Sequence, residues 1–193
     1  MASNPRVYIT PEQYLELDRK AEYKSEYYNG EMFAMSGGRA PHNSICANLL
    51  AELVMQLRKR PCNAYTSDQR VRIPATGAYT YPDASAVCGE PMFLDETRDT
   101  LLNPSLIVEV FSPSTEDYDR GKKSKGYRSI GSLAEYLMIA SEEIGVELLS
   151  RQLDGTWSIR EFTNLNDVVE LKSVGVRLAL ADLYDKVDLT PAP

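Results

Sequence analysis

Two acidic residues stand out because each lies in or beside a stretch that should form a buried β-strand. Glu109 interrupts the apolar run "SLIVEVFS" at 105–112, and Asp83 follows Pro82 in "YPDASAV". An ionised carboxylate is costly to bury alone, so such a residue needs a cationic partner, a metal ion or a solvent-lined cleft. If the two strands are neighbours, both carboxylates can reach one divalent cation, Mg²⁺ or Mn²⁺, because hard cations prefer oxygen ligands.

A basic segment follows the second of these strands, although the chain has a net charge of −7 that argues against a general polyanion-binding protein. Residues 120–128, "RGKKSKGYR", contain basic side chains and no acid. In a helix beginning near residue 117, Lys123 and Tyr127 lie four apart and so share one face. The other basic residues suit nucleic-acid backbone contacts or simple solvation: Arg120, Lys122, Lys125 and Arg128.

Two further polar residues are secondary candidates for the site. Glu31 follows the dipeptide Asn29-Gly30, where an exposed strand position explains it about as well as a place in a cleft. His42 is the only histidine and begins a predicted helix after the glycine-rich "SGGRAP". A histidine at a helix start can contact a substrate phosphate, but a structural role is the more common one.

The pattern around these residues predicts a mixed α/β (α+β) fold, with a central sheet flanked by helices. Thr10, Pro11 and Gln13 form the capping-box signature of a short N-terminal helix, and "EYYNGEMFAM" predicts a β-hairpin with a type I′ turn. Apolar residues four apart predict a long helix over 42–59. Strands are expected at 63–73, 81–88, 105–111, 135–140, 145–150, 156–162 and 168–178, before a closing helical turn.

Length and composition predict one globular domain. A chain of 193 residues with 43% hydrophobic and 25% charged residues suits a single core, expected over 1–190 with a loose tail at 191–193. The cysteines are odd in number and widely spaced, so we expect reduced, buried thiols rather than disulfides or a zinc site: Cys46, Cys62 and Cys88. The absence of a signal-like or membrane-length apolar run predicts a cytoplasmic protein that makes no membrane contact.

A family resemblance rests on the segments around both acids. The sequence "YPDAS", followed by "NPSLIVEVFSPSTEDYDRGKKSKGYRSIGSLAEYL", resembles the Uma-two family of restriction endonuclease-like proteins in the PD-(D/E)XK nuclease-like superfamily. The likeness extends from "TPEQYLEL" to "LADLY". It implies a restriction-endonuclease-like fold, with Asp83 and Glu109 as the metal-binding acids. The lysine that the superfamily places two residues after the glutamate is Phe111 here, and the residue that matches it in this family is Lys123. A long lysine side chain on a helix packed beside the strand can reach this site, with Tyr127 positioning the ammonium or a phosphate.

Two functions of different classes follow. The first is a Mg²⁺-dependent DNA endonuclease with Asp83, Glu109 and Lys123 as catalytic residues, and a homodimer by analogy with enzymes that cut both strands. An ordinary lysine is protonated near pH 7, so Lys123 would stabilise negative charge rather than act as a base. The alternative is a non-catalytic nuclease-fold module that binds nucleic acid or protein, favoured by the acidic net charge and by Phe111. A two-carboxylate sugar hydrolase is a distant third.

Overall fold

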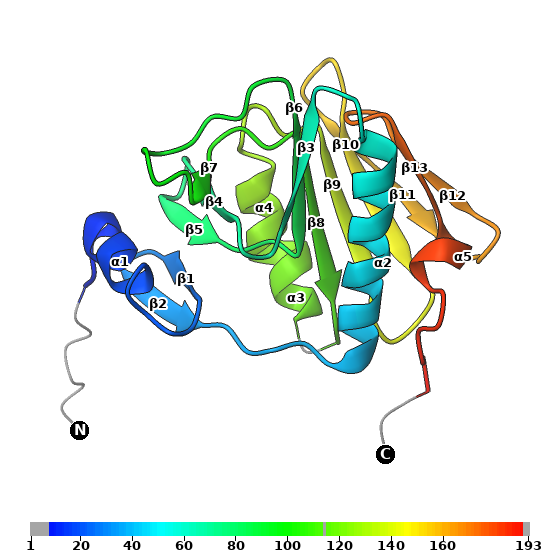
Figure 1. Ribbon diagram of the computed structural model, residues 1–193, viewed down its shortest axis with the longest axis horizontal. Coiled ribbons are helices and arrows are strands. Elements are labelled where there is room, and N and C mark those ends of the chain that lie inside the picture. Colours follow the sequence, from blue (N-terminus) through cyan, green and yellow to red (C-terminus); the bar gives the residue numbers. More distant parts are fainter. Residues whose placement is uncertain (1–7, 114, 191–193) are drawn as a thin grey trace.

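A six-stranded mixed sheet forms the centre of the fold (Figure 1). The computed structural model describes residues 8–113 and 115–190. The strand order is β11-β10-β9-β8-β6-β3, antiparallel throughout except for the parallel pair β8 and β9. The strands are β3 (Cys62–Thr66), β6 (Ala84–Cys88), β8 (Leu106–Phe111), β9 (Glu135–Ala140), β10 (Val146–Arg151) and β11 (Trp157–Phe162).

Strand β8 lies inside the sheet, and all six of its residues are buried. Its side chains alternate between the two faces, as the period of two requires. Leu106, Val108 and Val110 join the apolar cluster that contains the inward face of helix α2 (Ala40–Leu57). Ile107 and Phe111 join the cluster on the opposite face. Glu109 belongs to this second face by alternation, so it points away from α2.

Helices cover both faces of this sheet (Figure 1). On the α2 side, the two-stranded sheet of β12 (Val168–Leu171) and β13 (Val176–Ala179) leads into α5 (Leu180–Leu183) and completes the apolar core. On the Glu109 side the chain forms three short helical pieces in succession: α3 (Glu116–Tyr118), the π-helix η1 (Asp119–Lys123) and α4 (Ser124–Tyr127). A π-helical turn is uncommon and is often found at a functional site.

A second sheet flanks the Glu109 face, in the order β2-β1-β5-β4-β7. Its hairpin turns at Asn29 and Gly30, whose φ angles of 48° and 84° are those of the expected type I′ turn. The N-terminal helix α1 packs beside it, started by the reciprocal capping box of Thr10 and Gln13. The elements are α1 (Pro11–Asp18), β1 (Ser25–Tyr28), β2 (Glu31–Ala34), β4 (Arg70–Ile73), β5 (Ala78–Thr80) and β7 (Thr100–Leu101).

A buried ion pair joins α1 to this second sheet. Arg70 Nη2 lies 3.0 Å from Asp18 Oδ2, and the same carboxylate oxygen accepts a hydrogen bond of 2.5 Å from the Tyr81 hydroxyl. Asp18 also accepts from the Ser25 backbone N–H, at the start of β1. These contacts fix the hairpin sheet in place, and therefore fix the side chains that β1 directs toward η1.

Most of the expected elements are confirmed, but the strands are shorter and more numerous. The stretch 63–73 is two strands, β3 and β4, that enter different sheets, and 168–178 forms the hairpin β12-β13. Strands β5 and β7 were not expected. Strand pairing explains the differences between the expected and the observed strands. The β-propensity of a segment does not show where the chain leaves one sheet and enters another.

The expectation of reduced thiols is wrong for two of the three cysteines. Cys62 and Cys88 form a disulfide, and Cys46 is the free cysteine. The two residues are 26 apart in the chain but face each other across the antiparallel pair β3 and β6. Within the described ranges, none of the helices is long and apolar enough to span a membrane.

Candidate active site

Glu109 projects from β8 into a polar cluster rather than into apolar packing. Its Oε1 atom accepts hydrogen bonds from Lys123 Nζ at 3.1 Å and from the Tyr127 hydroxyl at 2.7 Å. The Tyr127 oxygen also lies 3.0 Å from Thr80 Oγ1 on β5. The helical spacing of Lys123 and Tyr127 therefore brings both side chains to one carboxylate oxygen.

Lys123 is surrounded by three carboxylates that come from three different elements. Besides Glu109, its Nζ lies 3.1 Å from Glu26 Oε1 on β1 and 3.6 Å from Asp119 Oδ1, one turn earlier in η1. Glu26 is held in turn by the Tyr81 backbone N–H and the Tyr118 hydroxyl, each at 3.4 Å. We call these four side chains (Glu26, Glu109, Asp119 and Lys123) the lysine cluster.

Burial and charge act against each other within the lysine cluster. Burial raises the pKa of Glu109 to about 8, although the Lys123 charge opposes the shift, and burial also raises the pKa of Asp119. Burial alone would lower the pKa of Lys123, but the charges of Glu109, Glu26 and Asp119 together raise it well above its usual value. The ammonium therefore stays protonated, and Lys123 is suited to stabilise negative charge rather than to accept a proton.

Asp83 lies immediately before β6, on the strand next to β8. Ala84 pairs with Val108, so Asp83 and Glu109 are the next residues along these two antiparallel strands. Asp83 Oδ2 accepts a 2.7 Å hydrogen bond from the Val110 backbone N–H. Its other oxygen lies 3.3 Å from His42 Nε2 on α2. Asp83 thus stands between the lysine cluster and the first turn of α2.

The contact with Asp83 changes the acid–base behaviour of His42. Hydrogen bonding to Asp83, and secondarily to Cys46, raises the pKa of His42 to about 11, because the protonated ring is favoured beside a carboxylate. Cys46 lies one helical turn further along, with its Sγ 3.6 Å from His42 Nδ1. The secondary candidate His42 is therefore a neighbour of Asp83.

The donor chemistry fits a divalent cation. Four carboxylates gather at this place, counting Asp83 and Glu109 themselves, and Lys123 and His42 are the cations that contact them. With every group ionised, four negative and two positive charges leave two negative charges, and carboxylate oxygens are ligands that Mg²⁺ and Mn²⁺ accept. Among the described residues, the metal-type donors closest together are a different set, His42, Cys46 and Asp83, whose ligand atoms lie within 4.8 Å of one another.

A cleft of about 430 Å³ opens beside the lysine cluster, between the hairpin sheet and the η1–α4 segment. Lys122, Lys123 and Lys125 line one wall, and Tyr28 and Thr80 are among the residues opposite. The Lys122 ammonium lies 5.9 Å from the centre of the Tyr28 ring. Both Lys122 and Lys125 are exposed, so their charges are available to an anionic ligand.

The other sequence candidates lie apart from this cleft or are already paired. Arg120 bonds to Glu116 and Glu147, and its guanidinium lies over the ring of Phe111, the residue at the usual lysine position. Arg128 donates to the Ser124 carbonyl oxygen. Glu31 pairs with Tyr28 across the hairpin and does not line the cleft.

Glu26 and Asp119 are members of the lysine cluster that the sequence reasoning missed. Asp119 precedes Lys123 by four residues, a spacing that predicts an i, i+4 ion pair and was available in the sequence. Glu26 lies in the arm "SEYY" of the hairpin, and one acid in a short strand is only a weak indication of a buried ion pair. Its partner comes from a segment 97 residues later, so only the tertiary structure reveals the contact.

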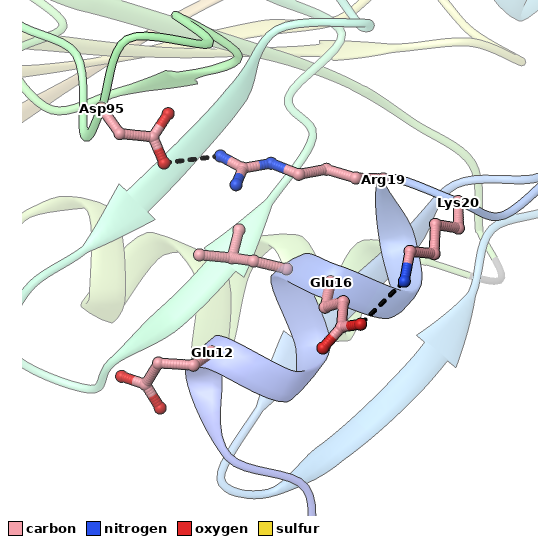
Figure 2. A pocket seen from close by; sticks show the side chains of 6 residues that line it. Glu12, Glu16, Arg19, Lys20 and Asp95 are labelled. Atoms are coloured by element: carbon pink, nitrogen blue, oxygen red, sulfur yellow. Dashed lines mark hydrogen bonds and ion pairs between the residues drawn. The ribbon is translucent and has the colours of Figure 1, made fainter.

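A second hollow, beside α1, is a less suitable site (Figure 2). Figure 2 shows Arg19 directed toward Asp95 and Lys20 directed toward Glu16, and each of these ion pairs measures 2.7 Å. Arg19 also bonds to Asp99. Because its basic groups are already neutralised by neighbours, this hollow has little charge left for a ligand.

Comparison with known proteins identifies the family and supports the fold. Residues 11–181 match the Uma2 family, described as "Putative restriction endonuclease". The chain belongs to this family. A crystal structure of a protein from Anabaena variabilis, titled as a putative nuclease belonging to DUF820, superposes with a TM-score of 0.74. That likeness covers 91% of this chain and 97% of the other at 19% identity, and so supports the fold.

Two curated relatives, both uncharacterized proteins of Synechocystis sp., are similar over most of their length. One is 35% identical over 182 residues, which covers 94% of each chain. The other is 34% identical over 162 residues, which covers 84% of this chain and 92% of the relative. The Uma2 membership and the restriction-endonuclease-like fold expected from the sequence are therefore confirmed.

We predict that His42 remains protonated through neutral pH in the metal-free protein. Because its folded-state pKa lies above the unfolded value, the ion pair with Asp83 stabilises the fold fully below about pH 6.5. The contribution declines as the pH rises toward about 11. His42 is the only histidine, so one imidazole resonance in an NMR titration with EDTA reports this pKa directly.

The matched variants for this titration are Asp83→Asn and Glu161→Gln. Asp83→Asn should move the pKa of His42 toward its ordinary value of about 6.5, and Glu161→Gln, an exposed position on β11, should leave it unchanged. A wild-type resonance that titrates near pH 6.5 would contradict the ion pair.

We also predict that Lys123→Met strongly destabilises the fold. Removing the ammonium leaves buried carboxylates without a cation, and breaking such a cluster costs about 3–5 kcal/mol. Lys122→Met, at the neighbouring exposed position, should change the free energy of unfolding by no more than about 0.5 kcal/mol. Urea unfolding of the three proteins measures both values, and equal stabilities of the two variants would refute the structural role of the cluster.

Proposed function

We propose that this protein is a Mg²⁺-dependent DNA endonuclease that hydrolyses phosphodiester bonds at Asp83, Glu109 and Lys123. The observation that carries the proposal is the hydrogen bond from the Lys123 ammonium to Glu109, on the strand beside Asp83, in a restriction-endonuclease-like fold. This geometry supplies two acids and one lysine despite Phe111 at the usual lysine position. Membership of the Uma2 family supports the same reaction class.

Each residue has a distinct part in this proposal. Asp83 and Glu109 would hold Mg²⁺ or Mn²⁺, which when bound supplies a Lewis acid and lowers the pKa of its water. Lys123, kept protonated by its carboxylates, stabilises the negative charge that develops on the phosphate. Tyr127 fixes the orientation of Glu109 through its 2.7 Å hydrogen bond.

The cleft suggests how the substrate binds. Lys122 and Lys125 are exposed and lie beside Lys123, so they can contact the phosphates on either side of the scissile bond. Arg120 and Arg128 were expected to share this role. Arg120 is tied to two glutamates, and we therefore assign the main backbone contacts to the two lysines.

The alternative function is a non-catalytic module that keeps the nuclease fold for binding. One observation favours it: Glu109 is buried and already accepts hydrogen bonds from Lys123 and Tyr127, and its burial raises its pKa, which opposes the ionised form that a cation ligand needs. Such a carboxyl group suits a structural cluster. Cation binding and cleavage distinguish the two functions.

We predict metal-dependent cleavage of supercoiled and linear DNA that Glu109→Ala abolishes. The wild type should cut with Mg²⁺ or Mn²⁺ and stop in EDTA, and Glu109→Ala should also lose Mn²⁺ binding. Lys122→Ala should weaken DNA binding and lower its salt dependence without removing cleavage. Glu96→Ala, at an exposed position between β6 and β7, is the matched control; purified in the same way, it should cut like the wild type.

The outcomes separate the candidate functions. Cleavage that persists equally in Glu109→Ala would indicate a contaminating nuclease. If the wild type and Glu109→Ala both bind DNA but neither cleaves it under any metal condition, the result would support the non-catalytic module. Unchanged Mn²⁺ affinity in a folded Glu109→Ala variant would overturn the assignment of Glu109 as a ligand.

We further propose a homodimer, by analogy with nucleases that cut both strands of a duplex. The edge strand β11 offers a surface for association, since Ile159 on it is 59% exposed. Sedimentation at micromolar concentration should give twice the chain mass of 21.6 kDa. A single monomeric species at that concentration would contradict the dimer.

A further inference from the structure

A second group of metal-type donors lies on the α2 side of Asp83. His42 and Cys46 are four residues apart in α2, so their side chains share one helical face, and the loop before β6 places Asp83 opposite them. His42 Nε2 is 3.3 Å from Asp83 Oδ1, and His42 Nδ1 is 3.6 Å from Cys46 Sγ. One ligand atom from each residue lies within 4.8 Å of the other two.

The surroundings hold these side chains in position. The Val110 backbone N–H fixes one oxygen of Asp83 and leaves the other facing His42. The glycine-rich loop packs closely on the imidazole: a β-carbon at Gly38 would lie 2.5 Å from His42 Nδ1. Asn43 ties that loop down by donating to the Gly38 carbonyl oxygen at 3.0 Å. His42 and Asp83 retain 23% and 16% side-chain exposure, so water and ions can reach them.

The donor types select a particular class of cation. A hard ion such as Mg²⁺ has no affinity for a thiolate, whereas Zn²⁺ and Co²⁺ bind sulfur, imidazole nitrogen and carboxylate oxygen together. With bonds of about 2.0–2.3 Å, the ligands of a tetrahedral zinc ion lie roughly 3.3–3.7 Å apart. For a metal on His42 Nε2, the 3.3 Å separation from Asp83 Oδ1 falls in this range. The three donor atoms lie within 4.8 Å of one another, so the Cys46 sulfur needs to move by about 1 Å.

We propose that His42, Cys46 and Asp83 form a site for a zinc-like cation, with water as its fourth ligand. One ring nitrogen, the thiolate sulfur and one carboxylate oxygen make the three bonds to the ion. The thiol proton and one imidazolium proton leave to solvent. Three protein ligands and an open position distinguish such a centre from the closed four-ligand sites of structural zinc.

Asp83 would then be a ligand in two alternative cation sites. A zinc-like ion bound with His42 and Cys46 engages the carboxylate that the Asp83–Glu109 pair needs for Mg²⁺. This consequence rests on the proposed nuclease function, and it predicts that zinc inhibits cleavage in competition with Mg²⁺. The existence of the site does not depend on any nuclease activity.

Cobalt binding tests the site directly, because a bound thiolate gives Co²⁺ a charge-transfer band in the near ultraviolet. Cys62 and Cys88 form the disulfide, which leaves Cys46 as the free cysteine. The metal-free full chain should develop this band with one equivalent of Co²⁺ and lose it when Zn²⁺ is added. Cys46→Ser and His42→Asn should abolish the band, whereas Glu109→Gln should retain it.

A second measurement needs no variant. At a zinc concentration ten times its dissociation constant, alkylation of the Cys46 thiol in the wild type should slow about tenfold, because only the metal-free fraction reacts. The same concentration of Mg²⁺ should give no protection.

A wild type that shows neither the cobalt band nor zinc protection would overturn the proposal and leave His42 and Asp83 as an ion pair. A band that persists in Cys46→Ser would overturn it too, because another thiol would then be the ligand. Loss of the band in a folded Glu109→Gln variant would overturn the three-ligand site as well, because Glu109 would then take part in holding the ion. Failure of DNA cleavage alone would count against the nuclease function and not against this site.

Discussion

The structure depends on a single buried ammonium group. Lys123 comes from η1, and its three carboxylate partners come from the hairpin sheet, the central sheet and its own helical segment. A lysine without these partners would be too costly to bury, and the carboxylates would repel one another without the lysine. The lysine cluster therefore holds the hairpin sheet and the helical segment against β8, and it does so at the place where the candidate chemistry lies.

The backbone around the cluster is adapted to this arrangement. The antiparallel pairing of β6 with β8 brings Asp83 next to Glu109 in space, although the two are far apart in the chain. Across the cleft, Gly126 allows α4 to pack closely on β4, because a β-carbon there would lie 3.0 Å from Ile73 Cδ1. This close approach positions Tyr127, the next residue, to donate to Glu109. The adjacent residues Gly126 and Tyr127 thus link the packing of α4 on β4 to the geometry of the candidate site.

The sequence was informative where local patterns determine structure. The Asn29-Gly30 turn, the capping box of α1, the apolar stripe of α2 and the buried strand around Glu109 were all predicted, because each depends on residues close together in the chain. The family resemblance added Lys123, and the structure places its ammonium at Glu109.

Features that arise from long-range pairing could not be predicted in this way. Glu26 reaches Lys123 only because the second sheet folds over the Glu109 face, and Cys62 meets Cys88 only because β3 pairs with β6. The π-helical turn of η1 has no clear sequence signature. The contacts that sequence patterns did not predict are thus those that depend on which sheet each strand joins.

The disulfide between Cys62 and Cys88 has a mechanical consequence for the strand that begins beside Asp83. Strand β3 is the outer strand of the central sheet, and among the described strands it pairs with β6. A shift of one residue between paired strands would turn every side chain of the shifted strand to the opposite face. The covalent bond at Cys88 prevents β3 from sliding along β6, so the outer strand keeps its alignment with the strand that follows Asp83.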